Sequence, residues 1–166
     1  MFQFQSMVLL TITEAHARIE SAQPAVVCER SVDSAYRVFM RHASDKNIIT
    51  PCERTILSAW RDFLSSHFPI VPDYTIYVKT DPAVCLERLK WRGRSEEGNV
   101  SIEYLEEIDA LYDSWLTPSS SSSSSNVIVV DGNQCFDKVY KRCFEIVSEL
   151  SALPTDRKNN AVNIVH

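Results

Sequence analysis

The segment Ala25-Val26-Val27-Cys28-Glu29-Arg30-Ser31 decides the fold, because a short apolar run leads directly into charged residues. Two more apolar runs follow, Tyr74-Thr75-Ile76-Tyr77-Val78 and Val127-Ile128-Val129-Val130. None shows the regular polar–apolar alternation of a strand with one face in water, so both faces of each strand are expected to be buried. Segments of helical periodicity separate the runs. The sequence therefore predicts an α/β protein with a parallel sheet that has helices on both faces.

Helical segments are predicted from apolar spacing and from helix-start residues such as Ser31, Thr50 and Ser101. Their approximate ranges are 4–19, 31–43, 50–64, 82–92, 101–116 and 136–150. The serine tract at 119–125 has nothing to bury, so residues 118–126 are predicted to form a disordered surface loop. Residues 1–150 are expected to form one domain, followed by a polar tail at 151–166 that frays from Pro154.

Composition and charge argue against several classes of protein. A formal net charge of −5 does not suit a general nucleic-acid binder, which needs a basic surface. No apolar run approaches the roughly 20 residues of a membrane-spanning helix, and the N-terminal residues lack the pattern of a signal peptide. The five cysteines are odd in number and include no Cys-x-x-Cys pair. We therefore expect reduced thiols, no metal site and an intracellular location, mitochondrial or cytosolic.

A cluster of arginines follows the second apolar run, in Arg88-Leu89-Lys90-Trp91-Arg92-Gly93-Arg94-Ser95-Glu96-Glu97. On a helix that begins near Pro82, Arg88 and Arg92 lie on one face because they are four residues apart. Several guanidiniums at a mobile helix end suit the charge of a transferring phosphoryl group. The alternative is a solvated helix end with Arg–Glu pairs.

Glu29 and Arg30 occupy a position where ligands bind in open α/β sheets, beyond the carboxyl end of a strand. At such a position a carboxylate can accept the proton of a reacting hydroxyl, and the adjacent guanidinium can bind a nearby phosphate. The alternative is an ordinary charged loop, since the triplet alone is a weak signal.

Several motifs occur in one order along the chain. They are Phe4-Gln5-Ser6, Glu29-Arg30-Ser31-x-x-Ser34-Ala35-x-x-x-Phe39, the arginine segment at 88–97, Glu103-Tyr104-Leu105 and Trp115-Leu116. At these spacings the chain resembles the deoxynucleoside kinases, especially the thymidine-kinase-2-like and insect multisubstrate branch, over roughly residues 2–150. The resemblance implies a three-layer, P-loop-kinase-like sheet. It also implies transfer of the γ-phosphoryl group of ATP, with Mg²⁺, to the 5′-hydroxyl of a deoxynucleoside in nucleotide salvage, by a homodimer.

The resemblance assigns roles to residues on the nucleoside side. Gln5 would pair with the base through its amide, which both donates and accepts, and Phe39 would stack on the base. Arg30 would hold the 5′-hydroxyl and the nearby phosphate, and Glu29 is the nearest carboxylate for general-base work. Glu97 would bind the sugar 3′-hydroxyl. A core aromatic is the alternative for Phe39, and an ion pair is the alternative for Glu29.

Specificity is expected to depend on the apolar residues Val8, Ile12 and Ala35 of the nucleoside pocket. In family members that favour purines or deoxycytidine, the positions that match Ala35 and Ile12 carry an aspartate and an arginine. Small or apolar residues leave room for a thymine methyl group, so pyrimidine deoxynucleosides, thymidine foremost, are the predicted substrates.

The resemblance also assigns residues to the phosphate donor. Arg88, Arg92 and Arg94 would form a lid that clamps phosphoryl groups. The loop at 134–136 would hold the adenine of ATP, through Gln134, Cys135 and Phe136. No protein ligand for a metal ion is assigned.

The sequence departs from the family in two places. It contains no Gly-x-x-x-x-Gly-Lys-Ser/Thr phosphate loop: Gly93 and Gly98 have the spacing, but Asn99 and Val100 follow. In the family the strand before that loop lies mid-sheet, between the strands that match 26–27 and 74–78, so its absence predicts two unpaired strand edges. The chain also has Tyr36-Arg37 where the family has Arg-Tyr, so the resemblance assigns no role to Arg37.

Three explanations of the missing segment stay open: an incomplete gene model, a fragment, and a decayed or repurposed paralogue. The intact nucleoside-side and lid residues favour an incomplete sequence. Three functions stay open as well. The first is a deoxynucleoside kinase, whose activity the 166 residues would lack without a phosphate loop. The second is a non-catalytic nucleoside-binding or dimerisation remnant, and the third is a helical interaction protein.

Overall fold

A computed structural model describes residues 1–18, 26–68, 72–117, 126–152 and 161–165 of the chain. The described elements, in chain order, are α1 (Phe2–Ala17), β1 (Val26–Glu29), α2 (Val32–Ser34), the π-helix η1 (Ala35–Met40), α3 (Arg41–Asp45), α4 (Pro51–His67), β2 (Tyr74–Lys79), α5 (Pro82–Arg92), the 3₁₀-helix η2 (Ser95–Glu97), α6 (Ile102–Leu116), β3 (Asn126–Asp131), α7 (Phe136–Ser151) and β4 (Ala161–Val165).

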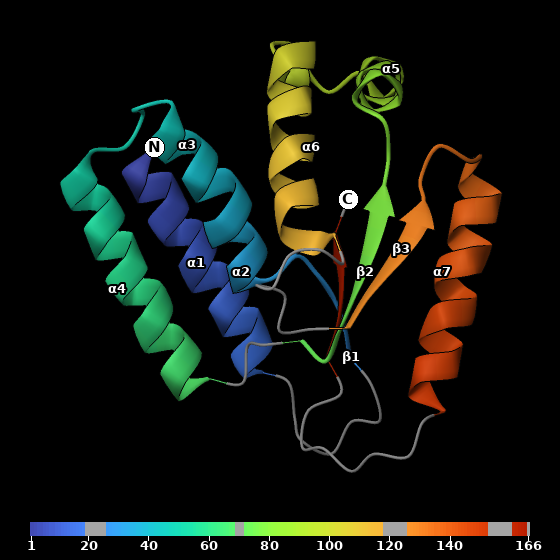
Figure 1. The fold of residues 1–166 in the computed structure, drawn as a ribbon, viewed down its shortest axis with the longest axis horizontal. Helices are drawn as coiled ribbons and strands as arrows, with labels where there is room; N and C mark the ends of the chain where they lie inside the picture. Colours follow the sequence, from blue (N-terminus) through green and yellow to red (C-terminus); the bar gives the residue numbers. More distant parts are fainter. Residues whose placement is uncertain (19–25, 69–71, 118–125, 153–160, 166) are drawn as a thin grey trace.

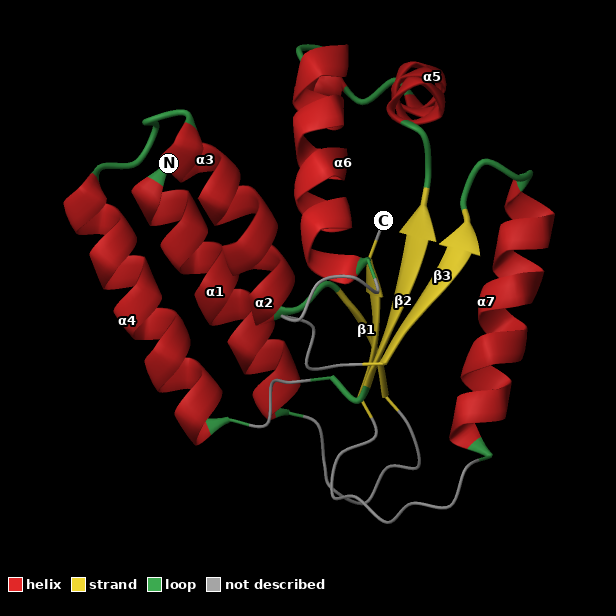
Figure 2. Ribbon diagram, viewed as in Figure 1, coloured by secondary structure: helices red, strands yellow, loops and turns green. Residues whose placement is uncertain are grey.

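The four described strands form one parallel sheet in the order β1-β4-β2-β3. Helix α7 lies on one face, and α6 lies on the other face beside the bundle of α1 to α4 (Figures 1 and 2). Ile76, Val130 and Ile146 belong to the core on the α7 side, whereas Tyr77, Tyr112 and Leu116 belong to the core on the α6 side. This arrangement confirms the predicted parallel sheet between two helical layers.

The expectation of a frayed tail is wrong for residues 161–165, because they form β4 in the middle of the sheet. β4 pairs with β1 on one side and with β2 on the other, so the two strand edges that were expected to lack a partner are joined. Val162 packs into the core on the α7 side and Val165 into the core on the α6 side, with exposed fractions of 3% and 0%. Burial of apolar side chains on both faces stabilises a strand at this position.

The predicted helix starts are confirmed by side-chain caps. Ser101 Oγ accepts a hydrogen bond from the Tyr104 N–H at 3.2 Å. Thr50 and Glu53 form a reciprocal capping box at the start of α4. Ser31 and Ser34 form another, with donor–acceptor distances of 2.9 and 3.1 Å, so a helical segment begins directly after β1 and continues through η1 into α3.

The remaining expectations concern loops and bulk properties. The predicted serine loop lies outside the described residues, except that Asn126 begins β3 instead of ending that loop. All five cysteines have free thiols. Among the described helices, none combines the length and the apolar character needed to cross a membrane.

Candidate nucleoside and phosphate site

The end of β1 presents Glu29 and Arg30, whose side chains are both exposed. Arg30 has a φ of 65°, in the left-handed region that residues other than glycine seldom adopt. Its backbone N–H donates to the Ile164 carbonyl of β4 at 3.1 Å. β4 therefore helps to hold a strained residue where the chain leaves the sheet, and such strain is often found at ligand sites.

Arg30 lies over the ring of Phe39, with 4.9 Å between the guanidinium carbon and the ring centroid. Phe39 is half-buried, and its ring meets that of Tyr112 edge-on at 6.3 Å between centroids. Burial raises the pKa of Tyr112 to about 12, so its hydroxyl stays protonated. The structure thus brings the predicted Arg30 and Phe39 together, on a wall that also contains Tyr112.

Tyr112 is a candidate site residue that was not predicted from the sequence. The available signal was helical spacing, because Tyr104, Ile108 and Tyr112 repeat every four residues and therefore share one face of α6. Tyr104 is close enough to Arg30 that the arginine charge lowers its pKa, although burial raises that pKa by more. The aromatic face of α6 therefore borders the end of β1.

The predicted base-reading residues lie on α1 and at the start of η1. Gln5 is 4% exposed, and its Nε2 donates to Met1 Sδ at 3.9 Å. Val8 and Ile12 pack, half-buried, against the cluster that contains the buried Ala35. The residues expected to set specificity therefore meet in one apolar cluster, whereas Phe39 packs against the neighbouring cluster on the α6 side.

The predicted lid arginines are paired with the predicted sugar ligand Glu97. Arg92 Nη2 donates to both carboxylate oxygens of Glu97, at 2.7 and 2.8 Å, and Arg92 Nε adds a bond of 3.0 Å. Arg94 lies 3.5 Å from the same carboxylate. The Arg–Glu pairing that the sequence left open is therefore present in the structure. A ligand that binds Arg92, Arg94 or Glu97 therefore has to replace these ion pairs.

The third lid arginine contacts the loop expected to hold adenine. Arg88 Nη2 donates to the Gln134 carbonyl at 2.9 Å. The Gly132 N–H donates to the Lys79 carbonyl at 2.7 Å, and a Cβ at Gly132 would lie 2.0 Å from Thr80 Oγ1. This close approach leaves no room for a side chain at position 132. Gln134, Cys135 and Phe136 follow on the surface, and the Phe136 side chain is 79% exposed.

A cluster with two carboxylates lies between β2 and α6, and it was not predicted from the sequence. The Tyr77 hydroxyl lies 3.4 Å from Asp109 and 3.3 Å from Asp113, and Lys79 pairs with Asp113 at 2.5 Å. Burial, and then the Asp113 charge, raises the pKa of Asp109. Spacing alone did not show this group, because its members come from two elements that are distant in the sequence.

The carboxyl ends of the parallel strands bring the predicted groups to one edge of the sheet (Figure 1). β1 leads to Glu29 and Arg30, β2 leads into α5 with its arginines, and β3 leads into the loop at 132–135. Ligands of open α/β proteins bind at this edge. Direct contacts join the predicted residues as separate groups: Arg30 with Phe39, Arg92 and Arg94 with Glu97, and Arg88 with Gln134.

The family model for deoxynucleoside kinase matches residues 1–153. The chain is 28% identical over 156 residues to thymidine kinase 2, mitochondrial, of Homo sapiens, with 93% of this chain and 58% of that protein covered. It is 29% identical over 162 residues to deoxycytidine kinase of Mus musculus, with 89% of this chain and 62% of that protein covered. The chain thus spans about three fifths of either relative's length. Because the family match extends over most of its residues, the chain belongs to the deoxynucleoside kinase family.

Proposed function

We propose that this chain forms the nucleoside-binding and lid portion of a deoxynucleoside kinase. The kinase would transfer the γ-phosphoryl group of ATP to the 5′-hydroxyl of a pyrimidine deoxynucleoside, thymidine or deoxycytidine, in nucleotide salvage. The observation that carries the proposal is the pair of Arg30 and Phe39 at the end of β1, with 4.9 Å between guanidinium and ring centroid. Both residues belong to the motif by which the chain resembles the family.

The Arg30–Phe39 pair couples base binding to the reacting end of the nucleoside. An exposed cation over an aromatic ring contributes only about 0.5–1 kcal/mol, so a base that stacks on Phe39 can displace the guanidinium at small cost. The released Arg30 can then donate to the 5′-oxygen or to a phosphate oxygen, which it binds more strongly than a ring face. Glu29, the residue before Arg30, is the proposed general base for the 5′-hydroxyl.

The preference for a pyrimidine follows from the apolar cluster that contains Ala35. Val8 and Ile12 pack against this cluster, and neither they nor Ala35 offer a charged partner to a purine edge. A thymine methyl group suits such a surface, and the buried Gln5 supplies a donor and an acceptor for the base.

ATP, with Mg²⁺, is the proposed phosphate donor. The lid arginines and the loop at 134–136 suit its phosphates and its ring, but the 166 residues contain no glycine-rich loop for the β-phosphate. The described residues include no group of three or more His, Cys, Asp or Glu side chains that could hold a metal ion. We propose that Mg²⁺ enters together with ATP.

The assembly and location are proposed as well. A homodimer is supported by exposed apolar side chains on α4, which include Ile56, Trp60 and Phe63. An intracellular location, mitochondrial or cytosolic, is supported by the free thiols.

The proposal is tested by calorimetric titration of the 166-residue chain with thymidine, deoxycytidine, deoxyadenosine and deoxyguanosine. We expect the two pyrimidine nucleosides to bind more tightly. Phe39→Ala should weaken their binding about tenfold or more, because stacking of a base on an aromatic ring contributes about 1–3 kcal/mol. Phe144→Ala, at an exposed position of α7, is the matched control and should leave nucleoside binding unchanged. A purine preference would refute the argument from Ala35, and tight binding to Phe39→Ala would refute the stacking role.

The values of kcat/KM for the four deoxynucleosides should follow the same ranking as their affinities when the chain is extended upstream by a phosphate loop. Thymidine and deoxycytidine are expected to exceed the purine deoxynucleosides in a coupled kinase assay. A clear preference for deoxyguanosine or deoxyadenosine would contradict the proposed specificity.

A further inference from the structure

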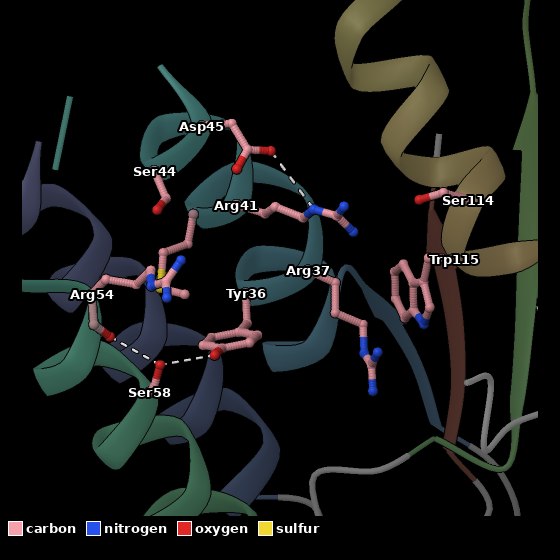
Figure 3. Close-up of a pocket in the computed structure, with 10 residues that line it drawn as sticks. Tyr36, Arg37, Arg41, Ser44, Asp45, Arg54, Ser58, Ser114 and Trp115 are labelled. Carbon is pink, nitrogen blue, oxygen red and sulfur yellow. Dashed lines mark hydrogen bonds and ion pairs between the residues drawn. The ribbon is translucent and has the colours of Figure 1, made fainter. Parts of the chain in front are cut away.

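A cavity of about 500 Å³ opens on the helical side of the molecule between η1, α3, α4 and α6. Figure 3 shows the side chains that surround it. Its lining consists of Tyr36, Arg37, Met40, Arg41, Ser44, Asp45, Arg54, Ser58, Ser114 and Trp115. Neither the Arg30–Phe39 pair nor the lid arginines belong to this lining, so the cavity is separate from the site described above.

The cavity contains three arginines and only one carboxylate. Arg41 and Asp45 lie 3.7 Å apart and both side chains are 60% exposed, so solvent weakens this pair. Arg54 has no carboxylate at ion-pair distance among the described residues. The lining therefore keeps an excess of positive charge, in a chain whose formal net charge is −5.

Arg37 has unused hydrogen-bonding capacity. Its Nε is buried and has no hydrogen-bond partner among the described residues. Asp33 Oδ1 lies 3.7 Å from this Nε, and it already accepts a hydrogen bond of 2.7 Å from Arg61 Nη2. A buried N–H group without an acceptor lowers the stability of the fold. A bound anion could accept hydrogen bonds from other N–H groups of the same guanidinium.

Neutral groups complete the lining. The Tyr36 hydroxyl and Ser58 Oγ lie 2.8 Å apart, and Ser58 also donates to the Arg54 carbonyl. The ring of Trp115 lies beside Arg37, with 5.9 Å from the guanidinium carbon to the ring centroid. Hydroxyls can bind phosphate oxygens, and an aromatic wall can hold a flat ring.

We propose that this cavity binds a small molecule that carries a phosphate group, such as a nucleotide. Guanidiniums match phosphate oxygens in charge and in their forked geometry. The volume lies within the range of about 300–1,000 Å³ that is typical of small-molecule pockets, and is larger than an inorganic ion needs. Tyr36 and Arg37 stand at the positions where the chain departs from the family pattern, so the site depends on residues particular to this sequence.

The test is calorimetric titration of the 166-residue chain, at about 0.15 M salt, with inorganic phosphate, pyrophosphate, thymidine monophosphate and thymidine. Saturable binding of pyrophosphate is expected. Thymidine monophosphate is titrated into Phe39→Ala, with and without the arginine changes, because in the wild-type chain it can also bind the proposed nucleoside site. The double variant Arg37→Gln, Arg54→Gln should weaken pyrophosphate binding by about tenfold or more, since two charge-assisted contacts are lost. Arg142→Gln on α7, also an exposed arginine, is the matched control. Thymidine should bind equally well to the double variant, because its proposed site includes neither arginine.

Two further variants keep the result interpretable. Arg54→Gln alone changes an exposed side chain on the surface of α4, so it should fold even if the buried part of Arg37 is needed for stability. Phe39→Ala should leave the phosphate-dependent binding in place. Equal affinity of the wild-type chain, the double variant and Arg54→Gln would overturn the proposal, as would loss of phosphate binding in Phe39→Ala alone. Failure of thymidine to bind anywhere would count against the proposed function and not against this cavity.

Discussion

The Arg92 guanidinium makes a forked contact with the Glu97 carboxylate at the end of the lid. The Arg92 side chain is 47% exposed, and exposed pairs of this kind contribute only about 0–1 kcal/mol to stability. Little free energy is therefore lost when the pair opens. Both groups remain available for a ligand, Glu97 for a sugar hydroxyl and Arg92 for a phosphoryl group.

Arg92→Ala is predicted to reduce kcat far more than nucleoside affinity in a chain extended upstream by a phosphate loop. An arginine that meets charge developing on the transferring phosphoryl group acts at the transition state, so kcat should fall by a factor on the order of 10². Steady-state kinetics and nucleoside titration provide the measurement. Arg142→Ala is the control, and an unchanged kcat would show that Arg92 forms only a surface ion pair.

Asp109→Asn is predicted to stabilise the 166-residue chain at neutral pH. Burial and the Asp113 charge raise the pKa of Asp109 above its ordinary value of 3.8. The folded state therefore binds the proton more tightly than the unfolded state, and the ionised carboxylate lowers stability at every pH above the folded pKa. This loss disappears as the pH falls through the folded pKa and below 3.8. The amide keeps an acceptor for Tyr77 without the charge.

Urea unfolding of both proteins at several pH values tests this prediction. The difference in the free energy of unfolding should be largest near pH 7 and should vanish in acid. Asp113→Asn is the matched control, and it should be destabilising because Asp113 pairs with Lys79. A lower stability of Asp109→Asn at pH 7 would mean that the ionised Asp109 is favourable in the folded protein.

At the scale of elements, β4 joins the two halves of the sheet. Among the described strands, β1 pairs only with β4, and β4 links it to β2. The Ile164 carbonyl also accepts the backbone N–H of Arg30. A strand from the end of the sequence therefore contributes both to the core and to the conformation of a proposed site residue.

Val162→Asp is predicted to destabilise the chain by about 3–5 kcal/mol, because it places an unpaired carboxylate in the core between β4 and α7. Nucleoside binding should weaken in the same variant, since Arg30 loses the support of β4. Urea unfolding and thymidine titration would measure the two effects. Leu10→Asp, at an exposed position of α1, is the control. Stability equal to that of the wild-type chain would show that β4 is dispensable in solution.

At the scale of the whole molecule, the 166-residue chain is predicted not to transfer phosphate from ATP. Phosphoryl transfer depends on positioning and on charge stabilisation. The lid arginines can contact donor phosphates, but no sequence of the phosphate-loop type supplies backbone amides and a lysine for them. Nucleoside binding without turnover is the expected behaviour.

A radiolabelled phosphate-transfer assay on purified, monodisperse protein tests this prediction, with thymidine and deoxycytidine as acceptors and Mg²⁺-ATP as donor. The Arg92→Ala variant provides the background. Turnover above that background would show that the chain has another means of holding ATP.

The sequence by itself determined the helices, three of the four described strands and the family motifs. These features depend on local patterns. Ser101 caps α6 by accepting a hydrogen bond from the N–H of Tyr104, three residues later, and the apolar runs alone predict β1, β2 and β3. The Glu29-Arg30-Ser31 motif likewise needs only its own strand and the helix that follows. Helix periodicity, capping and short motifs all act within a few residues, so a single sequence can show them.

Only the tertiary structure decided where the last strand lies and which side chains meet. β4 is a short segment at the end of a polar tail, and its strand conformation depends on pairing with β1 and β2. The ring of Phe39 meets that of Tyr112 on α6, and Arg37 and Arg54 line one cavity, because packing brings separate elements together. Such contacts depend on interactions between residues distant in the sequence, and no local pattern in this chain encodes them.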